Sequence, residues 1–461
     1  MASAFKGKRI LIFGLGLNQG GVGSAKFFAK QGAQVKVTDL KNAGILKPSL
    51  DQLKKIPDIS YTLGQHKYED ILWADLIIKN PAVKPGNPFM EYARKHGKKI
   101  EMDMGIFLQF IKPSQIIGIT GTKGKSTTAS LIYEVLSKHL GGVKLAGNIG
   151  KSVLDTIPHI IPDTLVVLEI SSFQLEAFNK HKVSPKWAVI TNITPDHLNY
   201  YTTMDEYVDS KKIIGKYQTG SDYLFLRKND PATTNPDFLK ALKGKIIYFS
   251  KDDLLASPSR LASEAKRAGG PKDFKPNLIG EHNLENMAAA LAVVKTFGVD
   301  ETTALEVLSS FKGIPFRMEL TKKWNGVKIY NDTTATSPEA GIQAIQTFPG
   351  SILICGGMNK GLDYKRYANE VAKNVKKVYL LEGDSTTAII SSLRPRTRSG
   401  GSKLDIHGPY HNLEKLLANV KTAVKPGDIV LFSPAATSFN LFQNEFDRGR
   451  QFNQAVQKVF K

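Results

Sequence analysis

Residues 115–140 read QIIGITGTKGKSTTASLIYEVLSKHL, and this stretch decides the fold. Its apolar beginning predicts a buried strand, and residues 127–140 predict a helix. The glycine-rich loop between them would point backbone N–H groups and the helix N-terminus at a phosphate group. Lys125 would reach the terminal phosphates of a nucleotide, and the Ser126 hydroxyl would ligate Mg²⁺. The stretch therefore predicts an α/β nucleotide-binding domain and an ATPase.

The spacing of this phosphate loop differs from the common one. A glycine usually stands five residues before Gly124, but here that position is Ile119. A glycine-rich turn without a ligand is the alternative interpretation, and the run Gly-Lys-Ser-Thr favours phosphate binding. The candidate nucleotide contacts are Gly121, Thr122, Lys123, Gly124, Lys125, Ser126 and Thr127.

Composition narrows the class of protein. The chain has 461 residues and a net charge of +21, and its lysines are scattered along the whole length. Nucleic-acid binding favours clustered Lys and Arg, so the scatter agrees better with small polyanionic substrates. No apolar run is long enough to span a membrane, and the N-terminus has no apolar signal region. Cys355 is the single cysteine, so we expect a core thiol in a cytoplasmic protein with no nucleic-acid or membrane partner.

Three blocks of the chain each begin like a nucleotide-binding α/β unit. Strands alternate with helices throughout, which predicts parallel sheets covered by helices. We expect an α/β protein of three domains: a Rossmann-like N-terminal domain (residues 1–103), a central domain with an ATPase-type parallel sheet (104–313) and a Rossmann-like C-terminal domain (314–461).

The first block suggests dinucleotide binding. A strand, a glycine-rich turn, a helix and a second strand follow one another, and Asp39 ends the second strand as a ribose-binding carboxylate would. However, Gln19 stands where a strict G-x-G-x-x-G pattern has its third glycine. A dehydrogenase domain, a related phosphate cradle and a purely structural turn all stay open from these residues alone.

The shortened phosphate loop, residues 120–127, resembles that of the Mur ligase family. The resemblance continues in order along nearly the whole chain, and the segment SSFQLE, residues 171–176, resembles the family's glutamate-adding member. The other matching segments are Gly147–Gly150, Glu169, Thr194–Leu198, Lys211, Gly280–Asn283, Asn286, Gly313–Glu319, Asn331–Asp332, Gly356–Lys360 and Ser433–Phe439.

The resemblance implies an ATP-dependent carbon–nitrogen ligase of peptidoglycan precursor synthesis. Such an enzyme joins glutamate to the L-alanine carboxylate of UDP-N-acetylmuramoyl-L-alanine through an acyl phosphate and releases ADP and phosphate. An ammonium beside Mg²⁺ would be repulsive, so the resemblance also implies that Lys211 is carbamylated. The implied catalytic residues are Lys125, Glu169, His197 and Lys211, and the implied ligands of Mg²⁺ or Mn²⁺ are Ser126, Glu169, His197 and Lys211.

The resemblance further implies that the three domains, in chain order, bind UDP, ATP and glutamate in a monomeric enzyme. The implied nucleotide contacts outside the phosphate loop are Asn283, Asn286, Arg317 and Asp332. The implied contacts with the two other substrates are Gly16, Asp39, Asn80, Asn148, Ser171, Thr336, Lys360 and Ser438.

One position departs from the family's usual glutamate pocket. Thr334 stands where a lysine commonly pairs with a glutamate carboxylate. The choice between D- and L-glutamate therefore stays open. The alternatives are the same ligase with L-glutamate, another Mur-type ligase, or a folylpolyglutamate ligase.

Overall fold

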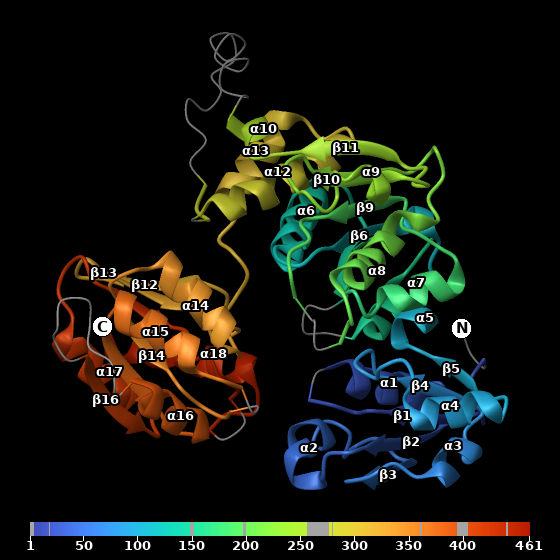
Figure 1. Cartoon of the computed structure of the whole chain (residues 1–461), viewed down its shortest axis with the longest axis horizontal. Helices are drawn as coiled ribbons and strands as arrows, with labels where there is room; N and C mark the ends of the chain where they lie inside the picture. The colour runs from blue at the N-terminus through green and yellow to red at the C-terminus, as the bar shows by residue number, and fades with distance from the viewer. Residues whose placement is uncertain are drawn as a thin grey trace. The chain divides into compact units, whose positions relative to one another are not determined.

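The computed structural model divides the chain into two compact units, Met1–Phe311 and Lys312–Lys461. The part of the chain that it describes forms three β-sheets, two in the first unit and one in the second (Figure 1). The residues that the structure describes are 4–17, 19–147, 152–196, 200–255, 276–278, 280–359, 362–393, 404–438 and 441–461.

The first sheet has the order β3-β2-β1-β4-β5, and its strands are parallel. The central strand reads RILIF and buries four of its five side chains, as expected where helices cover both faces of a parallel sheet. Its strands are β1 (Arg9–Phe13), β2 (Gln34–Asp39), β3 (Ile59–Leu63), β4 (Leu76–Lys79) and β5 (Lys99–Glu101). Its helices are α1 (Gln19–Lys30), α2 (Ala43–Leu50), α3 (Tyr68–Trp73), α4 (Pro88–Lys95) and α5 (Asp103–Phe107).

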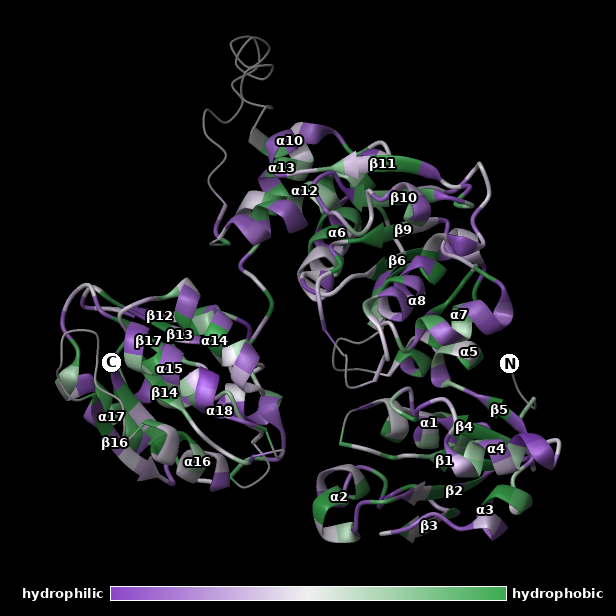
Figure 2. Cartoon of the chain, viewed as in Figure 1, coloured by the Kyte–Doolittle hydropathy of each residue, from purple (hydrophilic) through white to green (hydrophobic). Residues whose placement is uncertain are grey.

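The second sheet, also parallel, has the order β11-β10-β9-β6-β8-β7. Its interior strands are mostly apolar, whereas its helices mix polar and apolar residues (Figure 2). Its strands are β6 (Ile116–Thr120), β7 (Val143–Gly147), β8 (Leu165–Glu169), β9 (Trp187–Ile190), β10 (Tyr223–Arg227) and β11 (Lys245–Phe249). Its helices are η1 (Pro113–Gln115), α6 (Lys125–His139), η2 (Val153–His159), α7 (Leu175–His181), α8 (Met204–Lys216), α9 (Pro236–Leu239), α10 (Asp252–Leu255), α12 (Glu281–Lys295) and α13 (Glu301–Ser310).

The sheet of the second unit has the order β12-β13-β17-β14-β15-β16. Its strands are β12 (Glu319–Trp324), β13 (Val327–Asn331), β14 (Ser351–Cys355), β15 (Val375–Leu381), β16 (Asp405–Tyr410) and β17 (Ile429–Phe432). Its helices are α14 (Pro338–Thr347), α15 (Lys365–Asn374), α16 (Asp384–Leu393), α17 (Leu413–Ala423) and α18 (Glu445–Val459).

One strand pair departs from the parallel pattern. β12 and β13 form an antiparallel hairpin. Asn325 and Gly326 connect them with φ of 44° and 78°, the backbone that a two-residue hairpin turn requires and that Asn-Gly favours. The predicted α/β fold with parallel sheets is confirmed, and this hairpin adds an antiparallel edge to it.

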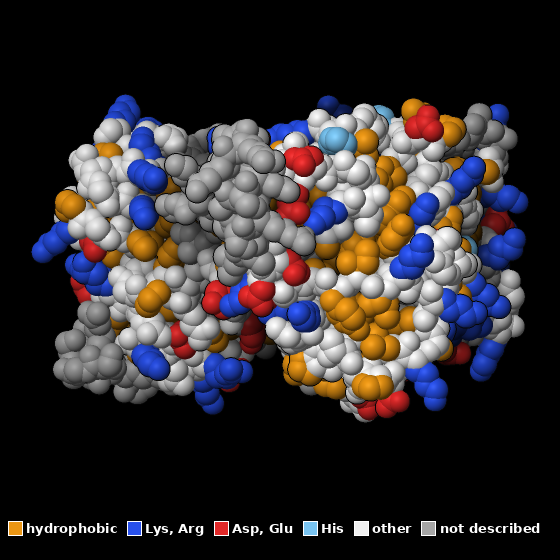
Figure 3. Space-filling view, turned by 90° about the horizontal axis from the view of Figure 1, so that it is seen from above, with side chains coloured by type: hydrophobic (Ala, Val, Ile, Leu, Met, Phe, Trp, Pro, Cys, Tyr) orange, Lys and Arg blue, Asp and Glu red, His pale blue; other side chains and the backbone are white. Residues whose placement is uncertain are grey.

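The described residues can be compared with the expectations drawn from apolar runs, charge and the single cysteine. Within them, none of the helices combines the length and the apolar character needed to cross a membrane. Figure 3 shows Lys and Arg side chains spread over one face and interrupted by apolar and acidic ones. Cys355 is fully buried in β14, where burial raises the pKa of its thiol to about 12. The domain boundaries expected at residues 103/104 and 313/314 stay predictions.

Candidate active site

The phosphate loop lies between β6 and α6, and two of its glycines are sterically required. Gly121 and Gly124 have φ of 143° and 87°, which side chains rarely adopt. A Cβ atom at Gly121 would lie 2.0 Å from Thr191 Oγ1, and one at Gly124 would lie 2.2 Å from Asn286 Oδ1. The loop is therefore packed against neighbours that leave no room for side chains at these two positions.

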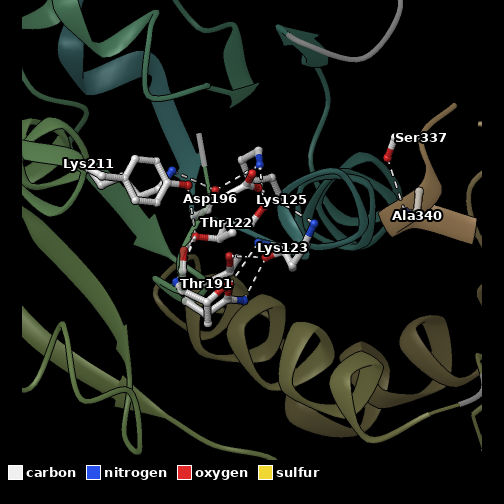
Figure 4. Close-up of polar contacts among 12 residues, drawn as sticks. Thr122, Lys123, Lys125, Thr191, Asp196, Lys211, Ser337 and Ala340 are labelled. Carbon is white, nitrogen blue, oxygen red and sulfur yellow. Dashed lines mark hydrogen bonds and ion pairs between the residues drawn. The ribbon is translucent and has the colours of Figure 1, made fainter. Parts of the chain in front are cut away.

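The end of β9 holds the loop in place (Figure 4). The Thr122 amide donates to Asn192 O at 2.8 Å, and the Lys123 amide donates to Asn192 Oδ1 at 3.0 Å. The Lys123 carbonyl accepts from Thr191 Oγ1 at 2.6 Å and from Asn192 Nδ2 at 2.9 Å. These four hydrogen bonds fix the loop against the residues that follow β9.

Two lysines reach the same loop. Lys125 Nζ donates to Gly121 O and Thr122 O, both at 3.0 Å. Lys211, 1% exposed on α8, donates from Nζ to Gly121 O at 2.9 Å (Figure 4). Burial, followed by the charge of Lys125, lowers the pKa of Lys211 to about 7, while Asp196 acts in the opposite direction. The neutral amine of Lys211 is therefore easier to form than that of an exposed lysine.

Tyr207 is a site residue that motif reasoning missed. Its ring lies 4.7 Å from Lys211 Nζ, and its hydroxyl shares a 3.1 Å hydrogen bond with Thr122 Oγ1. Burial raises the pKa of this hydroxyl to about 12, so it stays protonated. The signal in the sequence was its spacing, because residues four apart lie on one helix face and Tyr207 precedes Lys211 by four.

Glu169 ends β8 and is only 1% exposed, so it is a buried carboxylate rather than a surface one. It pairs in register with Ile119 of β6, next to the loop. Ser126 is half-buried and Thr127 is buried at the start of α6. The structure therefore brings Glu169, Ser126 and Lys211 to one edge of the second sheet, while His197 lies outside the described residues.

The start of α12 reaches the loop from the other side. Thr128 Oγ1 donates to Asn286 Oδ1 at 3.3 Å, and Asn286 Nδ2 donates to Asn283 Oδ1 at 3.2 Å. Both predicted nucleotide contacts on α12 thus lie beside Gly124 and the start of α6. The structure confirms that these residues are neighbours, and their roles stay predictions.

The first sheet gathers a second group of predicted residues. Asp39 is buried and accepts from the amides of Gly16 and Lys41, each at 2.8 Å. Asn80 Nδ2 donates to Gly14 O at 3.2 Å. Gly16, Asp39 and Asn80 therefore meet at the carboxyl edge of this sheet, whereas Asn148 lies outside the described residues.

Two further residues flank these groups. His66, which the motifs did not identify, stacks on Phe13 with ring centroids 3.9 Å apart. Its Nδ1 atom lies 2.8 Å from Thr38 Oγ1.

In the second sheet, Ser171 Oγ donates to Gln174 Oε1 at 3.0 Å. This contact closes a tight turn at the start of the segment SSFQLE.

In the second unit, Asp332 directly follows β13 and is buried. It accepts from Ser433 Oγ at 3.0 Å and from the Met318 amide at 3.2 Å, and burial raises its pKa to about 7. Arg317 is exposed and Thr336 is half-buried, and both belong to segments next to Asp332. Ser438 is buried, and its hydroxyl has no hydrogen-bond partner among the described residues. Lys360 lies outside them.

Arg448 on α18 links two loops of this unit, and no motif pointed to it. Its guanidinium is fully buried and donates to Thr333 Oγ1 and Thr333 O at 2.8 Å and to Ala436 O at 3.0 Å. Burial lowers its pKa to about 9, so it stays charged at neutral pH. Thr334, at the position of the expected lysine, donates to Phe316 O at 3.1 Å.

The chain is similar to known proteins over nearly its whole length. Three family models match: "Mur ligase MurD-like, N-terminal domain" at residues 8–101, "Mur ligase middle domain" at 119–294 and "Mur ligase, glutamate ligase domain" at 316–436. Curated relatives include UDP-N-acetylmuramoylalanine–D-glutamate ligases of Roseiflexus sp. (38% identity), Borreliella burgdorferi (37%) and Clostridioides difficile (34%). The first two alignments cover 98% of both chains, and the third covers 98% of this chain and 99% of the relative.

Solved structures share the fold. A crystal structure of UDP-N-acetylmuramate-alanine ligase MurC from Thermotoga maritima has a TM-score of 0.57 at 20% identity, over 98% of this chain and 99% of that chain. The MurF ligase of the same organism, in complex with ADP, has a TM-score of 0.52 at 18% identity, over 97% and 98%. Taken with the family models and the full-length relatives, these results show that the chain is an ATP-dependent ligase and belongs to the Mur ligase family.

Proposed function

We propose that this ligase joins D-glutamate to the L-alanine carboxylate of UDP-N-acetylmuramoyl-L-alanine, an acid–D-amino-acid ligation in peptidoglycan precursor synthesis. One observation carries the proposal: relatives named for this reaction align with 98% of both chains at up to 38% identity. The residues 1–103, 104–313 and 314–461 would bind UDP, ATP and glutamate, respectively. The enzyme would act as a monomer in the cytoplasm.

Ser126, Glu169 and His197 would hold Mg²⁺ or Mn²⁺ together with the phosphates of ATP. The buried carboxylate of Glu169 at the loop edge supplies the hard oxygen that such an ion prefers. When bound, the ion would neutralise charge on the transferring phosphoryl group.

Lys211 would be carbamylated and would support a second ion. Its burial and its pKa of about 7 support this, because only a neutral amine attacks CO₂. The nitrogen lone pair forms a bond to the carbon of CO₂, and one proton leaves the nitrogen. The product is an anionic carbamate, which removes the positive charge beside Lys125.

Catalysis would rest on holding the substrates in position and on neutralising the charge of the transferring phosphoryl group. An oxygen of the L-alanine carboxylate attacks the γ-phosphorus of ATP, ADP leaves, and an acyl phosphate results. The ammonium of Lys125 would neutralise charge on the phosphoryl oxygens during this transfer. The glutamate amine then attacks the acyl carbon, phosphate leaves, and the amine loses a proton. Asn283, Asn286, Arg317 and Asp332 would bind the nucleotide.

Other residues would bind the two remaining substrates. Gly16, Asp39, Asn80, Asn148 and Ser171 would contact the muramoyl nucleotide. Thr336, Lys360 and Ser438 would contact glutamate, and the buried hydroxyl of Ser438, without a partner among the described residues, could donate to a carboxylate. Thr334 keeps L-glutamate as a second candidate, because it supplies no cation and its hydroxyl donates to Phe316 O.

The test is phosphate release from ATP with UDP-N-acetylmuramoyl-L-alanine and D-glutamate, L-glutamate, L-lysine or no amino acid. Release that requires both the muramoyl nucleotide and D-glutamate supports the proposal. A preference for L-glutamate would keep the mechanism and change the substrate. Release that is indifferent to the muramoyl nucleotide would contradict the proposal, and Lys125→Ala serves as the inactive control.

A further inference from the structure

The helix α7 joins the two sheets of the first unit. It follows the segment SSFQLE of the second sheet, yet its charged side chains pair with residues of the first sheet. Glu176 Oε2 accepts from Lys79 Nζ at 2.7 Å. At the other end of the helix, Lys180 and His181 contact Glu101 at 2.8 and 3.0 Å.

The geometry makes these contacts a specific attachment. Lys79 ends β4 and Glu101 ends β5, and these two strands are paired neighbours. Glu176 and Lys180 are four residues apart, so they lie on one face of α7. The side chains of Lys79 and Glu101 are only 9% and 8% exposed, whereas those of Glu176 and Lys180 are 46% and 52% exposed, so each pair joins a buried charge to a half-exposed one. The helix therefore lies across the carboxyl ends of two adjacent strands.

A short chain of contacts runs through the Lys79–Glu176 pair. On one side, Lys79 precedes Asn80, whose amide side chain donates to Gly14 O and whose Cβ leaves no room for a side chain at Gly14. On the other side, Glu176 follows Gln174, which accepts from the amide and the hydroxyl of Ser171. The pair therefore connects the glycine turn of the first sheet with the Ser171 turn of the second.

We propose that the Lys79–Glu176 ion pair is a positioning contact that aligns the two halves of the muramoyl-nucleotide site, one on each sheet of the first unit. The inference rests on the proposed function, which places Asn80 and Ser171 on the same substrate. The phosphate loop is held by β9 and α12 instead, so loss of the pair leaves its contacts intact. The pair thus governs binding of the muramoyl nucleotide and leaves binding of ATP unchanged.

The test is a double-mutant cycle with Lys79→Met, Glu176→Gln and the double variant. We expect each single variant to raise KM for the muramoyl nucleotide roughly tenfold, a coupling of ordinary size for two groups of one ion pair. KM for ATP stays within about twofold of wild type, and the double variant is no worse than either single variant. A mere loss of stability would lower the active fraction, and hence kcat, without separating the two KM values.

Lys36→Met is the matched control. It removes a lysine that pairs with Asp70 at 2.9 Å within the first sheet domain, so it breaks a similar ion pair that does not reach α7. This control should leave both KM values unchanged. Single variants whose KM for the muramoyl nucleotide stays within about twofold of wild type, or whose effects multiply in the double variant, would overturn the inference.

Hydrogen–deuterium exchange separates this inference from the proposed function. We expect Lys79→Met and Glu176→Gln to speed exchange in peptides that cover residues 14–17 and 80–83, and Lys36→Met not to do so. If wild-type enzyme fails to use the muramoyl nucleotide, the proposed function is wrong, and exchange still tests the alignment. Unchanged exchange in both single variants would overturn the alignment itself.

Discussion

Replacement of Arg448 by methionine tests the buried link between two loops of the second unit. The side chain is fully buried, and its three hydrogen bonds to Thr333 and Ala436 join the loops that follow β13 and β17. Methionine fills a similar volume but donates no hydrogen bond. Two backbone carbonyls and one hydroxyl then lose their donor inside the protein.

The lost hydrogen bonds determine how much the free energy of unfolding should fall. A buried acceptor left without a donor costs about 1–3 kcal/mol, and Arg448→Met leaves two such carbonyls. Removal of a desolvated charge returns part of that free energy. We therefore expect the free energy of unfolding of the second unit to fall by about 3 kcal/mol. Ligase activity should fall as well, because the same loops carry Asp332 and Ser438.

Trp324 gives an assay for this unit alone. The chain has three tryptophans, and Trp324 is the only one after residue 311. In a Trp73→Phe, Trp187→Phe background, its fluorescence during urea unfolding reports the second unit. Arg450→Met is the matched control, because Arg450 on the same helix is 55% exposed and only approaches Asp447 at 3.6 Å. A loss below about 1 kcal/mol for Arg448→Met, or one equal to the control, would refute the reasoning.

Three other perturbations follow. Lys211→Ala should lower ligase activity by at least about 10²-fold. Added short carboxylates should restore part of this activity, whereas more ATP should not. Wild-type activity in the variant would exclude the carbamate. Gly124→Ala should weaken ATP binding in calorimetry, because its Cβ would lie 2.2 Å from Asn286 Oδ1 at a φ of 87°, whereas Gly141→Ala, with open space around it, should not. Burial raises the pKa of Asp332 to about 7, so the folded state holds that proton more tightly than the unfolded state, and stability falls as pH rises from about 4 to 7. In the variant Asp332→Asn, the free energy of unfolding should lose this dependence on pH, which is worth up to about 4 kcal/mol in the wild type. Urea unfolding followed by Trp324 fluorescence measures both proteins, and a difference between them that does not change with pH would contradict the prediction.

Local patterns in the sequence predict much of this structure. The order of strands and helices predicts the parallel sheets, because such strands need helical crossovers. The position of the phosphate loop between a strand and a helix could also be predicted, because its glycines and the start of the helix are adjacent in the chain. Glu169 and Lys211 are brought beside it by the sheet, and the family resemblance identified both.

Contacts between distant segments could not be predicted in the same way. Arg448 approaches Thr333 from 115 residues away, and the sequence around either gives no sign of the other. The pair of Lys79 and Glu176 spans 97 residues and depends on how two sheets pack. The hairpin of β12 and β13 is different, because Asn325 and Gly326 were a readable turn signal.

The place of β17 in its sheet has a consequence for protein synthesis. Ribosomes deliver strands in chain order, yet β17, the last strand, lies between β13 and β14. Until β17 emerges, both neighbours present unpaired backbone N–H and C=O groups to solvent. The first sheet has no such gap, because its last strand, β5, joins at an edge. A nascent chain that stops before Ile429 therefore lacks the middle of the last sheet, so we expect such fragments to be recognised by chaperones and proteases.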